Sequence, residues 1–278
     1  MEPWQAFVLG VIEGITEYLP VSSTGHLVVA QRLMGIGIGA DKVAADAFAI
    51  SIQGGAILAV LGLYFRRILR IVMGLFGKDP EGLRLAIALV VAFLPAVVVA
   101  LLVGDQIKEK LFNMPSVIAA WIVGGIAILV VCAWRKRQPA KGGGKELMEL
   151  TWKMALVIGL LQCVAMWPGT SRSLMTIVGG MLVGLSLKSA VEFSFLLGVM
   201  TLGAATAKDT LDYGPLMLET FGPLNLTVGF LASFVFAALA VKWLVNYLQK
   251  HGMEGFGWYR IAIGLVVLGM LGAGWVHP

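Results

Sequence analysis

Charged residues and cysteines are both scarce in this sequence. Of its 278 residues only 13% are charged, whereas 59% are hydrophobic, and the mean hydropathy is +0.89. A soluble domain carries about 25% charged residues, so this composition excludes a soluble protein and indicates an integral membrane protein. The two isolated cysteines, Cys132 and Cys163, exclude a disulfide framework and a cysteine-based metal site.

The sequence also lacks the GxxxxGK[ST] segment of P-loop proteins, so it gives no support for nucleotide hydrolysis. A net charge of +5 could indicate a nucleic-acid partner in a soluble protein. Here the basic residues form short clusters between apolar runs, which is the charge pattern of membrane topology. We therefore expect the bilayer, and no nucleic acid, as a partner of this chain.

Long apolar runs are abundant, and a run of about 20 residues can cross a bilayer. Six such runs cover residues 47–64, 86–103, 116–134, 189–207, 224–247 and 257–275. The connections 65–84 and 135–153 are rich in Lys and Arg, which places both on the cytoplasmic side. The connections 104–115 and 208–222 carry balanced or acidic charge, so we expect them and both termini on the extracytoplasmic side.

Two further apolar stretches, 6–40 and 154–186, are broken at their centres by polar and helix-breaking residues. Their sequences, LGVIEGITEYLPVSSTGHL and IGLLQCVAMWPGTSRSLM, share a glycine, an acidic or amide residue three positions later, a proline and a cluster of small hydroxyl residues. We align Pro20 with Pro168 and Ser23 with Ser171, with one extra residue between the glycine and the proline of the first copy. Two ordinary kinked spans are the alternative to this internal repeat.

The repeat predicts the architecture. Residues 1–134 would form a first repeat with a re-entrant hairpin at about 6–40, and residues 154–278 a second with a hairpin at about 154–186. Each hairpin is followed by three spans, so the second repeat is inverted, and 135–153 is a cytoplasmic basic linker. We expect one all-α polytopic membrane domain, with six transmembrane helices plus two re-entrant helical hairpins whose tips meet at the membrane midplane.

The first hairpin contains the motif EGITEYLPVSSTGH, which begins at Glu13. Glu13 and Glu17 are four residues apart, so on a helix their carboxylates lie on one face. Two like charges repel unless they share something positive or one of them is protonated. The pair could therefore hold a divalent cation through oxygen ligands, or it could provide an acid beside an ionised partner.

The chain after Pro20 can begin a helix whose free N–H groups would bind an anion. The residues at this helix start are Ser22, Ser23, Thr24 and Gly25. Their hydroxyls could serve only as helix caps. His26 follows Ser23 by three residues on the same helical face, which would pair a nucleophile with a proton carrier, and Glu17 could orient the imidazole.

The second hairpin carries the motif PGTSRS, in which Arg172 lies between two apolar runs. An arginine at membrane depth is costly unless it is paired, and its planar fork suits a phosphate group. Snorkelling to the interface is the alternative. Small and hydroxyl residues flank the arginine: Gly169, Thr170, Ser171 and Ser173. Together the two motifs indicate a phosphate site with a nucleophile.

Both motifs closely resemble the two signature motifs of the undecaprenyl-diphosphate phosphatase family, also called bacitracin-resistance proteins. The resemblance covers essentially the whole chain. It implies a bacterial inner-membrane enzyme that removes the terminal phosphate from the C55 polyprenyl diphosphate and so regenerates the lipid carrier for cell-wall synthesis. It also implies a divalent cation, Mg²⁺ or Ca²⁺. The matching positions are Glu13, Glu17, Ser23, His26, Ser171, Arg172 and Thr176.

From the residues and the resemblance together we expect three groups of site residues. The catalytic group is Ser23, His26, Glu17 and Arg172, with Ser23 attacking phosphorus and His26 taking its proton. Glu13 and Glu17 would bind the metal. Substrate contacts would come from Ser22, Thr24, Gly25, Gly169, Thr170, Ser171, Ser173 and Thr176.

Some alternatives stay open at this stage. His26 could itself be the nucleophile, as a weaker similarity to the type-2 phosphatidate phosphatase superfamily would imply, but SRSLMTIVGG lacks the later histidine of that superfamily. A metal-bound water could also attack directly. An inverted repeat with broken helices is, in addition, the architecture of transporters, so a flippase of a phosphorylated polyprenyl lipid is the rival function. A homodimer is a further expectation.

The charge pattern generates a direct prediction of topology. Single cysteines placed in 66–84 and 135–153 of a cysteine-free variant should react with a membrane-impermeant reagent only after the cells are permeabilised. Cysteines in 208–222 should react in intact cells. The opposite labelling pattern would overturn the topology and the inverted repeat together.

Overall fold

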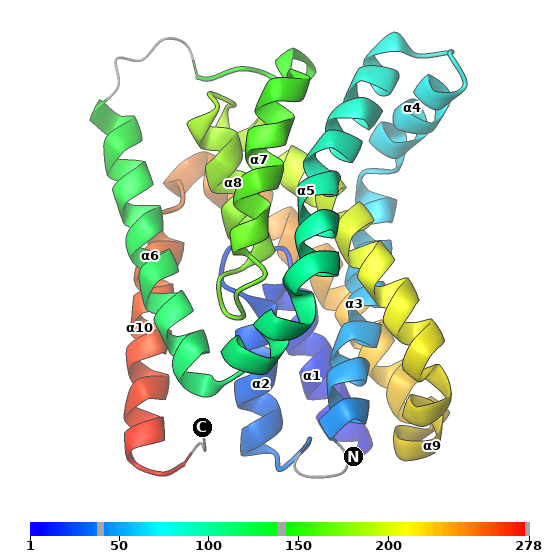
Figure 1. Ribbon diagram of the computed structural model, residues 1–278, viewed down its shortest axis with the longest axis vertical. Coiled ribbons are helices and arrows are strands. Elements are labelled where there is room, and N and C mark those ends of the chain that lie inside the picture. Colours follow the sequence, from blue (N-terminus) through cyan, green and yellow to red (C-terminus); the bar gives the residue numbers. More distant parts are fainter. Residues whose placement is uncertain (38–41, 138–142, 276–278) are drawn as a thin grey trace.

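The computed structural model describes the chain except for residues 38–41, 138–142 and 276–278. The described residues form helices and no strand (Figure 1). Among them, five helices are long and apolar enough to cross a membrane. The long helices are α3 (Lys42–Leu63), α5 (Pro80–Leu111), α6 (Met114–Arg137), α9 (Leu187–His251) and α10 (Glu254–Gly272). These features confirm the all-helical class and fit a polytopic membrane protein.

The shorter helices lie between the long ones along the chain. They are α1 (Pro3–Thr16), α2 (Ser23–Leu33), α4 (Phe65–Leu75), α7 (Trp152–Val164) and α8 (Arg172–Leu182), with a 3₁₀ turn η2 at Leu147–Glu149. Each of these helices is shorter than the roughly 20 residues that a span needs. The expected connection 65–84 is therefore not a simple loop, because it contains α4.

Helix α9 contains a break at Gly222, whose φ of 72° and ψ of 161° are not helical. Glycine adopts a positive φ without the steric penalty of other residues, and Pro223 follows it. We expected residues 208–222 as a connection between two spans, but all of them up to the break at Gly222 continue the first part of α9. Helix α3 packs against both parts, because Gly54 lies beside Thr206 of the first part and Phe230 of the second.

Helices α1 and α2 form one hairpin, and α7 and α8 form another. Ser22 and Ser171, the residues before α2 and α8, are the two non-glycine residues with positive φ in the described chain, at 73° and 79°. Each serine caps its helix by accepting a hydrogen bond from the N–H three residues later. The two hairpins thus share an unusual backbone geometry at the turn.

This geometry corrects the register of our repeat alignment. The same sequence spacing separates Ser22 from Ser171, Gly10 from Gly159 and Glu13 from Gln162. Ser171 therefore corresponds to Ser22, and Ser23 corresponds to Arg172. The alignment of Pro20 with Pro168 is wrong by one position. The first hairpin has one more residue between its glycine and its proline, and the second has one more residue between its proline and its capping serine.

Small residues bring α1 into close contact with the second part of α9. A Cβ added to Gly14 would lie 2.5 Å from the carbonyl oxygen of Ser233, and one on Gly10 would meet the backbone of Gly229. Helix α7 approaches α5 in the same way, with Gly159 against the backbone of Ala92. Backbone contact of this kind is typical of helices packed in membranes. It places both hairpins among the long helices.

The two ends of the molecule differ in what they contain. The start of α1 and the end of α10, the parts described nearest the two termini, lie at one end, whereas α4 and the end of α6 lie at the other (Figure 1). Helix α4 carries Arg66, Arg67 and Arg70, and α6 ends in Arg135, Lys136 and Arg137. The two basic clusters of the sequence are thus at the end opposite the termini.

Candidate active site

The turns of the two hairpins meet inside the protein. The hydroxyl of Ser173, in the second hairpin, donates a 2.8 Å hydrogen bond to the carbonyl oxygen of Leu19 in the first turn. Arg260 of α10 joins the turns a second time, because its Nη1 bonds the carbonyl of Pro20 at 3.2 Å and its Nη2 bonds that of Gly169 at 2.8 Å. The two sequence motifs therefore form one site.

Arg172 crosses from the second hairpin to the first. Its Nη2 forms an ion pair of 3.1 Å with Oε1 of Glu17, and its Nη1 donates to the carbonyl of Ser194 at 2.8 Å. The guanidinium lies 5.4 Å from the ring centroid of Tyr18. It also lies where a side chain on Gly198 would stand, so that glycine leaves the space that the guanidinium occupies. Arg172 is therefore paired inside the protein and does not snorkel to an interface.

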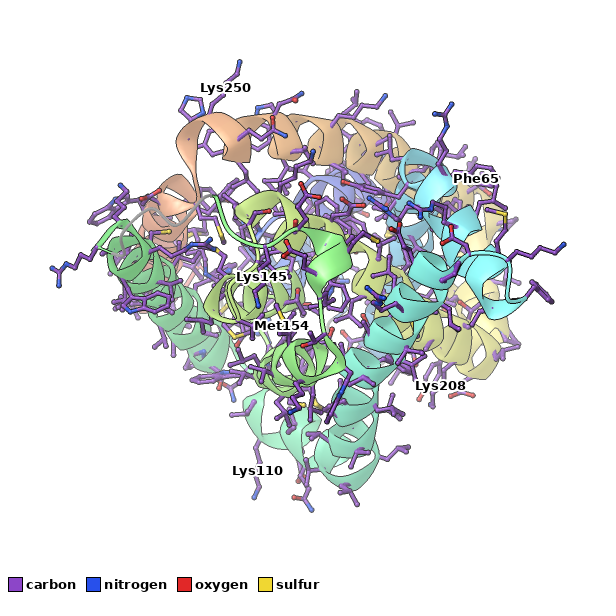
Figure 2. All side chains as sticks on the ribbon, turned by 90° about the horizontal axis from the view of Figure 1, so that it is seen from above. Phe65, Lys110, Lys145, Met154, Lys208 and Lys250 are labelled. Atoms are coloured by element: carbon purple, nitrogen blue, oxygen red, sulfur yellow. The ribbon has the colours of Figure 1, made fainter. Side chains whose placement is uncertain are left out.

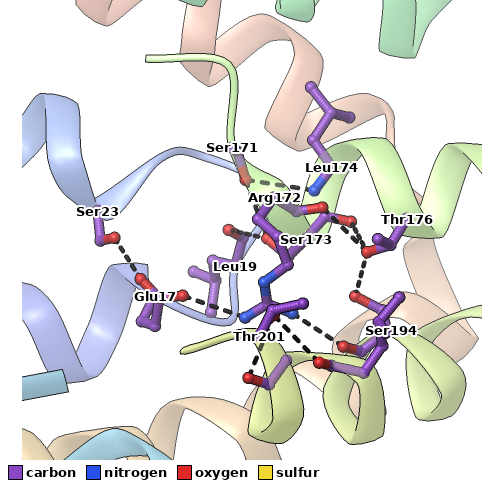
Figure 3. Close-up of polar contacts among 12 residues, drawn as sticks. Glu17, Leu19, Ser23, Ser171, Arg172, Ser173, Leu174, Thr176, Ser194 and Thr201 are labelled. Carbon is purple, nitrogen blue, oxygen red and sulfur yellow. Dashed lines mark hydrogen bonds and ion pairs between the residues drawn. The ribbon is translucent and has the colours of Figure 1, made fainter. Parts of the chain in front are cut away.

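Glu17 has a second partner on its other oxygen. The hydroxyl of Ser23 donates to Oε2 of Glu17, while Oε1 receives Arg172 (Figure 3). Ser23 is the first residue of α2 and Arg172 the first residue of α8. One buried carboxylate thus joins a hydroxyl and a guanidinium that stand at the starts of two different helices.

His26 lies in a different arrangement from the one we expected. Its Nδ1 is 2.7 Å from the carbonyl oxygen of Ser22, and its Nε2 is 2.7 Å from the hydroxyl of Tyr259. A carbonyl accepts only, so Nδ1 carries the proton and, in the neutral ring, Nε2 accepts from the tyrosine. The proton partner of Ser23 is therefore Glu17, and Glu17 does not orient the imidazole. The reason is local, since the bond to the carbonyl four residues earlier turns the ring toward α10.

Aromatic rings hold His26 in this place. The ring of Tyr259 stacks on it with a centroid separation of 5.8 Å and an interplanar angle of 6°. Trp121 of α6 meets it edge-on at 5.1 Å, and the Trp121 indole N–H donates to the carbonyl of Val21 in the first turn. The imidazole is thus clamped between two long helices and the first hairpin.

The other expected substrate residues fall into two groups. Ser22 and Ser171 cap their helices, Gly25 and Gly169 lie against α6, and the hydroxyl of Thr170 is buried without a hydrogen-bond partner among the described residues. Thr24 is half-buried in the first turn of α2. The hydroxyls of Ser173 and Thr176 are fully buried and bonded within the protein, to Leu19 and to Ser194 among others.

Several residues of the site escaped the sequence reasoning. Arg260 had a signal, because an arginine inside an apolar run is rare and is usually functional or structural. Tyr18 lies inside the first motif, but an aromatic side chain in an apolar segment does not by itself indicate a site residue. Trp121, Ser194 and Tyr259 lie in helices that read as simple spans, and only the three-dimensional contacts identify them.

Glu13 supplies the test of a metal site. It is completely buried, and neither carboxylate oxygen has a hydrogen-bond partner among the described residues. Those residues contain no group of three or more His, Cys, Asp or Glu side chains that could hold an ion by itself. Mg²⁺ is commonly bound through one or two carboxylates together with substrate phosphates, so the unpartnered Glu13 and the nearby Glu17 fit a cation that arrives with a phosphorylated substrate.

The described helices and the bridge from Ser23 through Glu17 to Arg172 define a polytopic helical protein with a buried polar site. The two helix starts at this site suit an anion. Comparison with known proteins then identifies the family. Residues 6–266 match the family described as bacitracin resistance protein BacA, and the chain belongs to that family. The match confirms the family that the two motifs indicated.

Curated relatives cover nearly the whole chain. A protein of Sorangium cellulosum named undecaprenyl-diphosphatase is 47% identical over 95% of this chain and 85% of its own length. Undecaprenyl-diphosphatase 2 of Rhodospirillum rubrum is 47% identical over 98% of this chain and 96% of its own length. An undecaprenyl-diphosphatase of Pseudomonas fluorescens is 43% identical over 99% and 98%, respectively.

The contacts of Arg260 predict a large effect on stability. Arg260→Met removes hydrogen bonds to four carbonyls, those of Pro20, Ala120, Trp121 and Gly169. A buried polar group left without a partner costs about 1–3 kcal/mol, so the variant should unfold at a clearly lower temperature in detergent. Arg260→Lys should recover only part of the loss, because an ammonium group cannot spread its donors as the guanidinium does.

The matched control is Lys242→Met, which removes an exposed cation from α9. Its unfolding midpoint, followed by intrinsic tryptophan fluorescence, should stay close to that of the unaltered protein. Equal midpoints for Arg260→Met and Lys242→Met would show that Arg260 does not hold the two turns together.

Proposed function

We propose that this chain hydrolyses undecaprenyl diphosphate to undecaprenyl phosphate and phosphate and thereby recycles the lipid carrier of cell-wall synthesis. The names of its relatives, which are undecaprenyl-diphosphatases, support this reaction. The observation that carries it is the bridge made by Glu17 between the hydroxyl of Ser23 and the guanidinium of Arg172. A carrier of the same lipid would need the anion site but has no evident use for a hydroxyl paired with a carboxylate.

In the proposed reaction, Ser23 Oγ attacks the terminal phosphorus and Glu17 accepts its proton. The bond from Oγ to phosphorus forms as the bond from phosphorus to the bridging oxygen breaks, and undecaprenyl phosphate leaves. Water then attacks the phosphoserine, releases phosphate and restores Ser23. Arg172 and the N–H groups at the starts of α2 and α8 stabilise the charge on the phosphoryl oxygens.

His26 has a different role in this scheme from the one that the sequence suggested. Both ring nitrogens are engaged, with Ser22 and Tyr259, which argues against a phosphohistidine intermediate. We propose that His26 and Tyr259 pass protons during hydrolysis of the phosphoserine, because the Tyr259 side chain is partly exposed and the imidazole connects it to the start of α2. Ser23 is then the nucleophile and Glu17 its base.

A divalent cation, Mg²⁺ or Ca²⁺, would be held by Glu13 and Glu17. When bound, it would neutralise part of the diphosphate charge and polarise its oxygens. The complete burial of Glu13 without a described partner supports this assignment. Both oxygens of Glu13 lack a described partner, whereas each oxygen of Glu17 also accepts one hydrogen bond, from Ser23 or from Arg172.

We further propose the detailed architecture expected from the sequence. The two parts of α9 on either side of Gly222 would supply two of six spans, and the hairpins α1–α2 and α7–α8 would be re-entrant. Residues 1–134 and 154–278 would be inverted repeats joined by a cytoplasmic linker at 135–153. The protein would lie in the inner membrane with its termini on the extracytoplasmic side, and it could act as a homodimer.

The function can be tested with the purified protein in detergent. Phosphate release from undecaprenyl diphosphate should fall by about a thousandfold or more in Ser23→Ala with little change in KM, because the lost interaction belongs to the transition state. Ser51→Ala, a serine replacement in α3, should keep nearly full activity. Substrate labelled in its terminal phosphate should leave acid-stable label on Ser23 after rapid quenching.

Acid-labile label on His26 would contradict the serine assignment while leaving the hydrolase intact. Nearly full turnover of Ser23→Ala would instead favour direct attack by water. Failure of the unaltered protein to release phosphate from this lipid would refute the proposed function itself.

The metal assignment makes a separate prediction. Glu13→Gln should raise the divalent cation concentration needed for half-maximal activity by about tenfold or more, because one anionic ligand is lost. The measurement is phosphate release titrated with Mg²⁺ and with Ca²⁺ after treatment with a chelator. An unchanged titration with reduced turnover would show that Glu13 acts as an acid or base and not as a ligand.

A further inference from the structure

A basic pocket lies where α3 ends and α4 begins, at the end of the molecule opposite the termini. Its volume is about 560 Å³, and its polar lining comes from Tyr64, Arg66, Arg67, Arg70 and Glu192. Tyr64 and Glu192 also line a second pocket of about 140 Å³. The second pocket has mainly apolar walls, to which Leu187, Val191, Val245 and Leu248 contribute. The basic pocket and the apolar pocket are therefore adjacent, and Tyr64 and Glu192 line both of them.

One guanidinium of the basic pocket has no ion-pair partner among the described residues. Arg67 pairs with Glu192 at 2.6 Å, and Arg70 pairs with Asp79 at 2.8 Å and Glu81 at 2.5 Å. Arg66 is exposed and forms no ion pair with any residue that the structure describes. Glu192, Asp79 and Glu81 thus compensate Arg67 and Arg70, which leaves the guanidinium of Arg66 to bind an external anion.

Helix α4 and Phe76, the residue that follows it, present an apolar face that is largely exposed among the described residues. Phe65, Leu69, Val72 and Phe76 follow each other at helical spacing, and their side chains are 62%, 45%, 41% and 75% exposed. Seen onto this end of the molecule, Phe65 lies at the edge of the helical bundle (Figure 2). Arg66 follows Phe65 directly in sequence, so the free guanidinium borders this apolar face.

The opposite side of α4 is fixed to α5. A Cβ on Gly74 would meet the backbone of Leu83, and one on Gly82 would meet the carbonyl of Arg70, so the two backbones are in contact. The ion pairs of Arg70 with Asp79 and Glu81 join the same two segments. Helix α4 is therefore held with its apolar face turned away from the protein.

We propose that α4 and the basic pocket bind the headgroup of an anionic phospholipid. Arg66 and Arg67 bind the phosphate, and Phe65, Leu69, Val72 and Phe76 insert among the lipid chains. An amphipathic helix with a basic border and an apolar face is the kind that lies in a membrane interface. The apolar second pocket gives room for the first part of an acyl chain beside the headgroup.

The apolar face distinguishes this ligand from a free anion. A soluble phosphate would use Arg66 but would leave the four apolar side chains in water. A lipid uses both features, because its phosphate lies at the boundary between headgroups and chains, where the arginine borders the apolar face. The site is also independent of the proposed hydrolysis, since it is built from α3, α4 and α9 and uses none of the residues assigned to the reaction.

The test measures lipid retention by the purified protein in a non-ionic detergent, using native mass spectrometry. The probes are dioctanoyl phosphatidylglycerol, phosphatidylcholine of the same chain length and inorganic phosphate. The unaltered protein should retain phosphatidylglycerol in preference to phosphatidylcholine. Arg66→Gln should weaken that retention by about fivefold, which corresponds to the roughly 1 kcal/mol that one basic residue contributes near an anionic lipid.

Two variants separate the pocket from general electrostatics. Lys250→Gln removes one positive charge at the end of α9, outside the pocket, and should leave retention unchanged. Phe65→Gln should weaken retention while keeping all charges. Equal loss in Lys250→Gln and Arg66→Gln, or equal retention of the two lipids, would overturn the proposal. Full displacement of the lipid by inorganic phosphate would show a site for soluble anions instead.

Discussion

Arg260 is the residue on which the arrangement of the site depends. Its guanidinium is fully buried and reaches four backbone carbonyls, two in α6 and one in each hairpin turn. Carbonyls in a broken membrane helix need a donor, because no water is available to them. An arginine at the same depth needs acceptors. Arg260 therefore donates to the carbonyls, and the carbonyls provide its acceptors. Because two of these carbonyls belong to the two hairpin turns, Arg260 holds the turns together, and Glu17 and Arg172 come into contact.

The two hairpins have the same cap geometry but different side chains, and this difference makes one composite site from two similar parts. Ser22 and Ser171 hold a positive φ, a conformation that costs about 1–3 kcal/mol and persists where the surroundings enforce it. The next residue begins the helix in both hairpins, and it is Ser23 in one and Arg172 in the other. The hydroxyl and the guanidinium that the proposed reaction uses therefore occupy equivalent positions and meet at Glu17.

The sequence predicted what depends on local pattern and missed what depends on distant contacts. Apolar runs identified the long helices, and proline beside hydroxyl clusters identified both hairpins. The spacing of Ser23 and His26 placed both on one helical face, but it does not determine the side-chain rotamer of His26. A hydrogen bond to the carbonyl of Ser22 directs the imidazole to Tyr259. The helical segment up to Gly222 was missed because charge patterns indicate sides of a membrane and not backbone conformation.

The double use of Glu17 couples substrate binding to activation of the nucleophile in the proposed reaction. Without substrate, its carboxylate accepts hydrogen bonds from both Ser23 and Arg172, so the two groups that the proposed reaction uses are bonded to one side chain. A diphosphate binds a guanidinium more strongly than a single carboxylate does, because it has more negative charge and several acceptor oxygens. As Arg172 turns to the phosphate in the proposed reaction, Glu17 loses one hydrogen-bond partner and keeps the other, Ser23. Substrate binding and proton transfer from Ser23 would therefore both act on the same carboxylate.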